Sequence, residues 1–374
     1  MLKEYIKNHT AEIMQTWNDL HAIPEWGFKE FKTSAYLQKQ LEAHGIKCQQ
    51  MTETGFIAEL DSGKPGLTVG VRADIDALPY KNEAGETYYC HACGHDSHAT
   101  MALWTMFAMK DLGLVKTGKL RGVFQPAEEI FGAPSMISAG AGKGLDEFYG
   151  VHIRPIQEIR YGKASPALVH GSYAIAEVTI QGTTAHGARP HLGYNAINAA
   201  AMIVMSVNSI WLNPAESWSV KVTRIHSGGD VVNIVPDKAT LSLDLRAATN
   251  PLMDELRTKL QMAVENAAAA AGCTAQLNIG ECVPGAEYSP ECVEHLKEAI
   301  KDVLGEENVG APIITPGGDD FHCYHMADKN LKTAFLALGA DATPGLHNPQ
   351  MTFNHDAMLS GVEILTTALA GRVK

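Results

Sequence analysis

The order of apolar and polar positions divides the first part of the chain into alternating helices and strands. Helical spacing predicts helices at 1–20, 29–45 and 97–110, and apolar runs predict strands at 55–60, 67–76 and 119–129. These strands are apolar on both faces, as in a sheet that is covered on both sides. The pattern therefore predicts an α/β layer with a largely parallel sheet, with chemistry at the carboxyl ends of its strands.

The pattern changes near residue 171. It predicts, in chain order, a strand at 172–186, a helix at 194–210, strands at 217–228 and 233–247, and a helix at 251–272. This order is close to a split βαβ unit of roughly 100 residues. After Gly272 the α/β pattern resumes, with a strand at 274–280, a helix at 290–304, a buried strand at 332–339 and a last helix from about 355. We therefore expect a catalytic domain formed by 1–170 and 273–374, and an inserted domain at 171–272.

Composition narrows the function classes. The chain has 374 residues, which agrees with two domains, and a formal net charge of -12, which repels a phosphate backbone and argues against nucleic acid as a partner. Its 7 cysteines are odd in number and scattered, as in reduced proteins. Neither a signal peptide nor a membrane span is expected. These features predict a cytoplasmic protein without nucleic-acid or membrane partners.

The stretch "HACGHDSH" at 91–98 gathers the ligand types of transition metals. Cys93 and His95 are two positions apart, so in an extended segment their side chains project to one side and can share a metal or a metal pair. A thiolate and an imidazole suit zinc and its neighbours. Spacing alone leaves His91 and His98 open as further ligands. A polar loop is the alternative for any single histidine, and the density of the cluster argues against it.

Further metal-ligand candidates stand at the ends of predicted strands. Glu128 and Glu129 follow the apolar strand at 119–129, which argues against a merely solvated pair, and His152 and His347 come later. Neighbouring carboxylates repel unless a cation neutralises one of them. One can bind metal while the other stays free as a proton shuttle, as metal-assisted hydrolysis requires.

Two aspartates end the strand in "VRADIDALP". Asp74 and Asp76 are two positions apart. Such carboxylates either bind metal or accept a hydrogen bond from a ligand histidine and so fix its tautomer. Spacing alone does not decide between these roles.

Eight motifs in this order resemble the M20 metallopeptidase family, in particular its amidohydrolase branch of aminoacylases, hippurate hydrolases and auxin-conjugate hydrolases. They are "HAIPEWGFKEFKT", "RADIDALP", "HACGHDSHATM", "FQPAEE", "GVHIRP", "GTTAHGARPHLGYNAI", "VVNIVPDKA" and "PGLHNP". The similarity runs from about residue 21 to the C-terminus. It implies a zinc-peptidase-like α/β catalytic domain with a mostly parallel sheet, and an inserted ferredoxin-like α+β lid domain that mediates dimerisation.

The resemblance also implies residue roles. The metal ligands would be Cys93, His95, Glu129, His152 and His347, with Cys93 as the bridge between two ions. Glu128 would be the general base and acid. Asp74, Asp76 and Asp96 would contact the metal ligands and hold them in position without binding metal themselves.

In the lid, the resemblance places His186 near the substrate carbonyl in the partner subunit's site, where it would stabilise the oxyanion. Asn233 and Arg246 would hold the substrate carboxylate, for which the planar guanidinium is suited. An exposed lid charge is the alternative for Arg246, and packing after Pro190 is the alternative for His191.

The function implied is a cytoplasmic, homodimeric, metal-dependent amidohydrolase that hydrolyses the amide bond of N-acyl amino acids or related small conjugates by metal-activated water, with Glu128 as base. It would use two divalent metal ions per subunit, zinc or manganese, with cobalt or nickel as alternatives. A dipeptidase or aminopeptidase of the same fold is the close alternative. A non-catalytic metal-binding protein is a remote one, and a thiolate-metal switch is disfavoured because the ligands are spread from 93 to 347.

The chain departs from the branch at three places. Ile130 and Phe131 follow the glutamate pair where glycine is usual, and Asn195 replaces an aspartate. The segment "GGDDFH" replaces the Gly-Ser-Glu-Asp-Phe that is common in the branch, which leaves the roles of Asp319 and Asp320 open. No proposed ligand or base is lost, so we expect catalysis to survive while substrate choice differs.

Overall fold

The computed structural model describes residues 1–374 and divides them into two compact units. The first unit comprises Met1–Val169, Glu287–Ile313 and Asp320–Lys374, and the second comprises His170–Ala286 and Ile314–Asp319. No helix combines the length and the apolar character that a membrane span needs.

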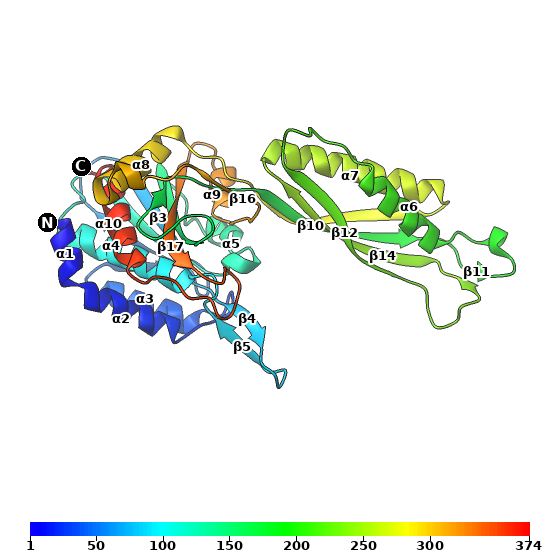
Figure 1. The fold of residues 1–374 in the computed structure, drawn as a ribbon, viewed down its shortest axis with the longest axis horizontal. Coiled ribbons are helices and arrows are strands. Elements are labelled where there is room, and N and C mark those ends of the chain that lie inside the picture. Colours follow the sequence, from blue (N-terminus) through cyan, green and yellow to red (C-terminus); the bar gives the residue numbers. More distant parts are fainter. The chain divides into compact units, whose positions relative to one another are not determined.

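The first unit is built on a seven-stranded sheet in the order β1-β2-β6-β3-β7-β17-β8. Figure 1 labels two of these strands, β3 and β17. Its strands are β1 (Lys47–Gln50), β2 (Phe56–Asp61), β3 (Thr68–Asp74), β6 (Lys119–Gln125), β7 (Glu147–Pro155), β8 (Ala164–Ser165) and β17 (Lys332–Ala342). The four central strands β6, β3, β7 and β17 are parallel, whereas the edge strands pair antiparallel. The prediction of an α/β fold with a mostly parallel central sheet is confirmed.

Helices cover both faces of this sheet. They are α1 (Leu2–Asn8), α2 (Thr10–His21), α3 (Phe31–Ala43), α4 (His95–Asp111), α5 (Ala133–Ser138), α8 (Pro290–Leu304), α9 (His322–Ala327) and α10 (Ala357–Ala370), with 3-10 turns η1 (Glu128–Ile130) and η3 (Glu306–Asn308). Successive residues of β7 serve different cores: Tyr149 belongs to the large core with α4, α8 and α10, and Phe148 to a smaller one with α5 and α9. Side chains that alternate across a strand explain this division.

Local differences from the sequence prediction lie at turns. The helix expected at 1–20 is two helices, because the backbone of His9 leaves the helical range between α1 and α2. An unpredicted antiparallel hairpin joins β4 (Leu78–Lys81) to β5 (Thr87–Cys90). It connects the end of β3 to the stretch of predicted metal ligands before α4, and Figure 1 labels its two strands, β4 and β5.

The second unit is a four-stranded antiparallel sheet in the order β12-β14-β10-β15 with two long helices on one face. Its elements are β10 (Ser172–Gln181), α6 (Ala196–Asn208), β12 (Trp218–Ser227), β14 (Lys238–Ala247), α7 (Asn250–Ala270) and β15 (Thr274–Val283). The short elements β9 (Leu168–His170), β11 (Ala185–His186), η2 (Pro190–Leu192), β13 (Ile234–Val235) and β16 (Ile313–Thr315) complete the chain. Side chains of β10 alternate between the core beneath α6 and α7 and the open face.

The strand at 274–280 was predicted in the larger unit, and this prediction is wrong. As β15 it pairs with β10, with Val178 opposite Leu277, and gives the insert the order βαββαβ. Its half-buried alternation is typical of an antiparallel strand with one open face. The chain enters and leaves this unit at adjacent points, because the Ala286 N–H donates to the His170 carbonyl at 2.9 Å.

Candidate metal centre

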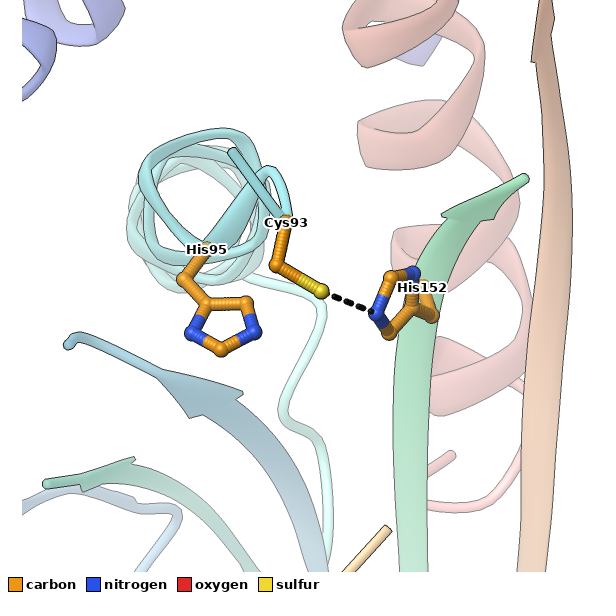
Figure 2. A group of neighbouring side chains, drawn as sticks. All are labelled: Cys93, His95 and His152. Atoms are coloured by element: carbon orange, nitrogen blue, oxygen red, sulfur yellow. Dashed lines mark hydrogen bonds between the residues drawn. The ribbon is translucent and has the colours of Figure 1, made fainter. Parts of the chain in front are cut away.

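The five side chains predicted as metal ligands come together in the first unit. Cys93, His95 and His152 form one group whose ligand atoms lie within 4.8 Å of one another, and Cys93, Glu129 and His347 form a second. Figure 2 shows the first group, with Cys93 Sγ 3.4 Å from His152 Nε2. Cys93 belongs to both groups, which is the arrangement that a bridging thiolate requires. The bridge itself remains a prediction.

A turn, not an extended segment, brings Cys93 and His95 together. His95 is the first residue of α4, and Gly94 before it has a left-handed backbone with φ 86. A Cβ at this position would lie 2.4 Å from the Ile153 side chain. The expected extended geometry of Cys93–His95 is therefore wrong, although the expected convergence is present, and Gly94 is required both for its φ and for its close contact.

The glutamate pair lies on the turn η1 between two left-handed residues, Ala127 with φ 58 and Phe131 with φ 68. This short helical turn replaces the extended geometry expected for the pair. Glu128 Oε2 and Glu129 Oε1 each lie 3.9 Å from His95 Nε2, and the two side chains are 13% and 10% exposed. Glu128 thus lies beside the ligand cluster and is largely shielded from bulk water.

Hydrogen bonds set the tautomers of two ligand histidines. His95 Nδ1 lies 3.0 Å from Asp76 Oδ1, and His152 Nδ1 lies 2.6 Å from the Ile153 carbonyl oxygen. Both acceptors place a proton on Nδ1, which leaves each Nε2 as the atom that would bind a metal. Asp76 also accepts the Glu129 backbone N–H at 3.1 Å, so one carboxylate supports two predicted ligands.

Asp74 and Asp96 have different partners. Asp74 accepts hydrogen bonds from His98 Nδ1 at 2.7 Å and from Arg72 at 2.6 Å, and its Oδ2 lies 3.9 Å from His95 Nε2. The hydrogen bonds of Asp96 come from His21 and the Ser97 N–H, and none comes from a predicted metal ligand. Asp74 thus lies next to the ligand cluster, whereas Asp96 joins α2 to the start of α4.

The two further histidines of "HACGHDSH" are buried. His98 Nδ1 contacts Asp74, and its Nε2 accepts the Ile153 N–H at 3.0 Å, so both nitrogens are engaged. His91 has no hydrogen-bond partner at either nitrogen. The sequence left both open as ligands, and neither belongs to the two groups that contain Cys93.

The cluster shifts the pKa values of its histidines in opposite directions. The neighbouring side chains of Cys93 and Glu129 raise the pKa of His347 to about 10. Burial lowers the pKa of His95, but the charges of Asp74 and Cys93 outweigh it and hold that pKa well above the ordinary value. The pKa of His152 lies well below its ordinary value because of burial and the neighbouring His98 and Arg154.

Two buried ligand atoms lack hydrogen-bond partners, namely His95 Nε2 and Glu129 Oε1. His347 Nε2 approaches Glu129 Oε1 to 3.2 Å as an ion pair without hydrogen-bond geometry. Buried polar atoms without partners are costly, and a shared cation would satisfy them. The nitrogen, sulfur and oxygen donors suit zinc and related divalent ions. The residues therefore fit the predicted pair of metal ions.

Two buried side chains that support this region gave no clear signal in the sequence. The Arg72 guanidinium links Asp74 to Asp320 at 2.6 and 2.7 Å, and Asp320 also accepts the Ala133 N–H at 2.8 Å. This gives Asp320, whose role the sequence left open, a structural partner. Only the apolar flanks of "VRAD" hinted that Arg72 is buried.

The second support is Glu30, which is fully buried. It accepts backbone N–H groups of Phe28 at 3.0 Å and Ala127 at 2.8 Å, both left-handed residues, and the Thr54 hydroxyl at 2.7 Å. It thereby fixes the backbone at Ala127, directly before the turn that carries Glu128 and Glu129. No spacing rule predicts a partner 97 positions away in sequence.

The predicted lid residues belong to the second unit. His186 on β11 pairs with Ile234, and the Gly187 N–H donates to the Asn233 carbonyl at 2.7 Å, so His186 and Asn233 lie together. The exposed His186 accepts the Ala188 N–H at Nδ1, which places the ring proton on Nε2.

Arg246 contacts Asp244, the Pro316 carbonyl and the Tyr173 ring. These partners are compatible with a structural role, and its role in substrate binding remains a prediction, as do those of His186 and Asn233. His191 is exposed in η2, without the packing offered as its alternative. Asn195 caps α6 by accepting the Ile197 N–H, a task that aspartate performs equally well.

The α/β fold and the two groups of predicted ligands are those of a metal-dependent hydrolase, and the comparison with known families agrees. Residues 70–371 match the family described as peptidase family M20/M25/M40. The chain belongs to this family.

Relatives within it are named as hydrolases of amide bonds. The chain is 30% identical to the IAA-amino acid hydrolase ILR1-like 2 of Arabidopsis thaliana, over 92% of this chain and 81% of the relative. It is 29% identical to an N-acetyldiaminopimelate deacetylase of Listeria innocua, over 96% and 99%. The solved YXEP protein of Bacillus subtilis, described as a dinuclear metal-binding peptidase of the M20 family, superimposes with a TM-score of 0.82 at 25% identity, covering 97% and 98% of the chains.

These findings confirm the predicted family and the predicted class, a metal-dependent hydrolase of amide bonds. They agree with divalent ions as cofactors and with small molecules as substrates.

Proposed function

We propose that the protein hydrolyses the amide bond of N-acyl amino acids or related small conjugates, with Glu128 as general base and general acid. The observation that carries the proposal is the position of Glu128: it lies 3.9 Å from His95 beside five convergent ligand side chains and is largely shielded from water. It comes from the same turn as the ligand Glu129, so the pair can divide its roles between proton transfer and metal binding.

Cys93, His95, Glu129, His152 and His347 would hold two divalent ions. When bound, such ions supply Lewis acidity, which lowers the pKa of water and stabilises negative charge on the amide oxygen. Glu128 would accept a proton from the attacking water and deliver it to the leaving nitrogen. Its partial burial supports this role, because a carboxylate held in place away from bulk water retains the proton between the two steps.

Residues that contact the predicted ligands and the base would hold these groups in position. Asp76 would hold the His95 ring and the Glu129 backbone in one arrangement. Glu30 would hold the backbone directly before Glu128. From the second unit, the proposed lid, His186 would donate its Nε2 proton to the oxyanion that develops in the partner subunit's site. Asn233 and Arg246 would bind the substrate carboxylate.

Relatives support the substrate class. One is named for a conjugate of an amino acid and another for an N-acetylated one, and both are matched along nearly the whole chain. We propose zinc or manganese as the metal, with cobalt or nickel as alternatives, because availability decides among ions of similar affinity. We also propose a cytoplasmic location, because the cysteines are scattered and free, as is usual in a reducing compartment.

We propose a homodimer formed through the second unit. Its β12 lies at a sheet edge with unpaired backbone groups, and exposed edges readily accept a partner strand. Apolar side chains on and after α6 are also exposed, among them Met205 at 67% and Trp211 at 76%. Light scattering at several concentrations would test the dimer, and a monomer throughout would contradict it.

The deciding experiment is hydrolysis by protein reconstituted with Zn²⁺ or Mn²⁺. N-acetyl amino acids and free dipeptides are compared at equal concentration, and we expect the N-acetyl compounds to be hydrolysed faster. Faster cleavage of dipeptides would indicate a peptidase instead, and metal binding without hydrolysis of any amide would indicate a non-catalytic protein.

The variant Glu128→Gln tests the base. It should retain both metal ions and lose at least about 100-fold in kcat, in line with the usual contribution of a general base. Undiminished turnover would remove Glu128 from the mechanism.

A further inference from the structure

His347 is the predicted ligand with the least support from packing. Its side chain is 55% exposed, and it lies in the loop between β17 and α10. Its backbone has φ 64, in the left-handed region that residues other than glycine rarely adopt. A strained and exposed residue keeps one conformation only if surrounding groups fix it.

Two hydrogen bonds fix the backbone of His347. Its N–H donates to the Ala92 carbonyl at 2.7 Å, next to Cys93. Its own carbonyl accepts the Tyr80 hydroxyl at 2.8 Å. The first bond joins two ligand-bearing segments directly. The second comes from Tyr80, which lies outside the sequence motifs and has no role in the proposed mechanism.

Tyr80 is held by the antiparallel β4–β5 hairpin. Tyr80 lies on β4, paired with Tyr88 on β5, and the same hairpin leads into the stretch that carries Cys93 and His95. Near the base of the hairpin, Cys90 Sγ lies 3.6 Å from the Pro349 carbonyl, in the loop that carries His347. The β4–β5 hairpin thus contacts the His347 loop at two places 267 and 259 positions away in sequence.

We propose that Tyr80 is a positioning residue for the metal ligand His347. By holding the His347 carbonyl, its hydroxyl keeps the backbone left-handed and the imidazole directed at Cys93 and Glu129. This inference rests on the proposed metal ligation by His347, but not on any particular substrate.

The inference predicts an unequal effect on the two ions. His347 belongs to the ligand group with Cys93 and Glu129, whereas His95 and His152 form the other group with Cys93. Loss of the hydroxyl should weaken the ion held by His347 and leave the other nearly unchanged. A general loss of stability would weaken both.

The test is Zn²⁺ binding by metal-free Tyr80→Phe, measured by equilibrium dialysis at graded free Zn²⁺ with metal analysis. One of two equivalents should need about 10-fold or more higher free Zn²⁺, the usual effect of losing a group that orients a ligand. The metal-free variant should unfold at the wild-type temperature. Hydrolysis lost at low Zn²⁺ should return at saturating Zn²⁺.

Tyr88→Phe is the matched control, because Tyr88 lies opposite Tyr80, its ring 5.9 Å away, and its hydroxyl makes no hydrogen bond. It should bind both equivalents like the wild type. Wild-type binding by Tyr80→Phe, equal weakening by both variants, or equal weakening of both ions would each overturn the proposal. A protein that shows the unequal effect but hydrolyses no amide would contradict the proposed function alone.

Discussion

Asp76 contacts His95 and the backbone of Glu129 with its two carboxylate oxygens, at 3.0 and 3.1 Å. Two predicted ligands from separate segments, the start of α4 and the turn η1, thus share one support at the end of β3. Asp76→Asn should lower metal affinity or activity by about 10- to 100-fold, because it disturbs the tautomer and orientation of His95.

The measurement is metal content at graded chelator, together with kcat. Asp61→Asn is a suitable control, since Asp61 lies on β2 and pairs with Lys119 at the surface. Equal metal retention by both variants would show that Asp76 does not orient His95.

Metal removal should lower the thermal stability of the protein. The cluster brings Glu128 and Glu129 together around His95, and ligand atoms there lack hydrogen-bond partners. A metal ion at about 1,000 times its Kd contributes about 4 kcal/mol to folding. Unfolding temperatures with EDTA and with excess Zn²⁺ should therefore differ clearly, and the difference should shrink in His347→Ala. Identical temperatures with and without metal would contradict binding at this site.

Glu30 should make stability depend on pH. Burial raises its pKa from 4.5 to about 7, although hydrogen bonds from Thr54 and the backbone oppose the shift. Between these pH values the folded chain retains a proton that the unfolded chain releases, so the free energy of unfolding falls as pH rises. The loss reaches at most about 3 kcal/mol, at 1.36 kcal/mol per pKa unit.

Urea unfolding of wild type and Glu30→Gln at pH 4.5, 6 and 8 checks this prediction. Glutamine can keep the backbone contacts of Glu30 but does not titrate. The stability of Glu30→Gln relative to wild type should therefore rise from pH 4.5 to pH 8. A constant difference would exclude a raised pKa.

An ion pair at the C-terminal segment should contribute to the stability of the fold. Arg372 binds Glu147 on β7 through two guanidinium nitrogens, with Glu147 2% and Arg372 26% exposed. Arg372→Met leaves a buried carboxylate without its cation, and we expect a loss of about 2–3 kcal/mol, below the value for a fully buried pair. The double variant with Glu147→Gln should regain part of this loss in urea unfolding. A double variant less stable than the single one would contradict the argument.

The sequence predicted what depends on local patterns. Apolar runs identified the central strands, and polar residues at their ends identified Glu128, Glu129 and His152. The position of His347 after a predicted strand made it a candidate ligand, and the resemblance then supplied its role. The predicted sheet strand at 274–280 was assigned to the wrong unit, because a strand pattern does not say which edge the strand joins.

The supports around the centre escaped prediction for a different reason. Tyr80 with His347, Glu30 with Ala127, and Arg72 with Asp320 each pair residues that are far apart in the chain. Their contacts depend on the completed sheet and on turns whose left-handed residues, such as Ala127 and Phe131, are not glycine. Propensity rules predict glycine at such positions and so gave no signal.

The single hydrogen bond between His170 and Ala286 has a consequence for how this architecture can vary. Because the boundaries of the insert adjoin, its length and surface can change without altering the course of the strands that present the metal ligands. The βαββαβ segment can therefore be replaced as a unit. A protein engineer could graft a related insert between these two residues and leave the strands that carry the predicted metal ligands intact.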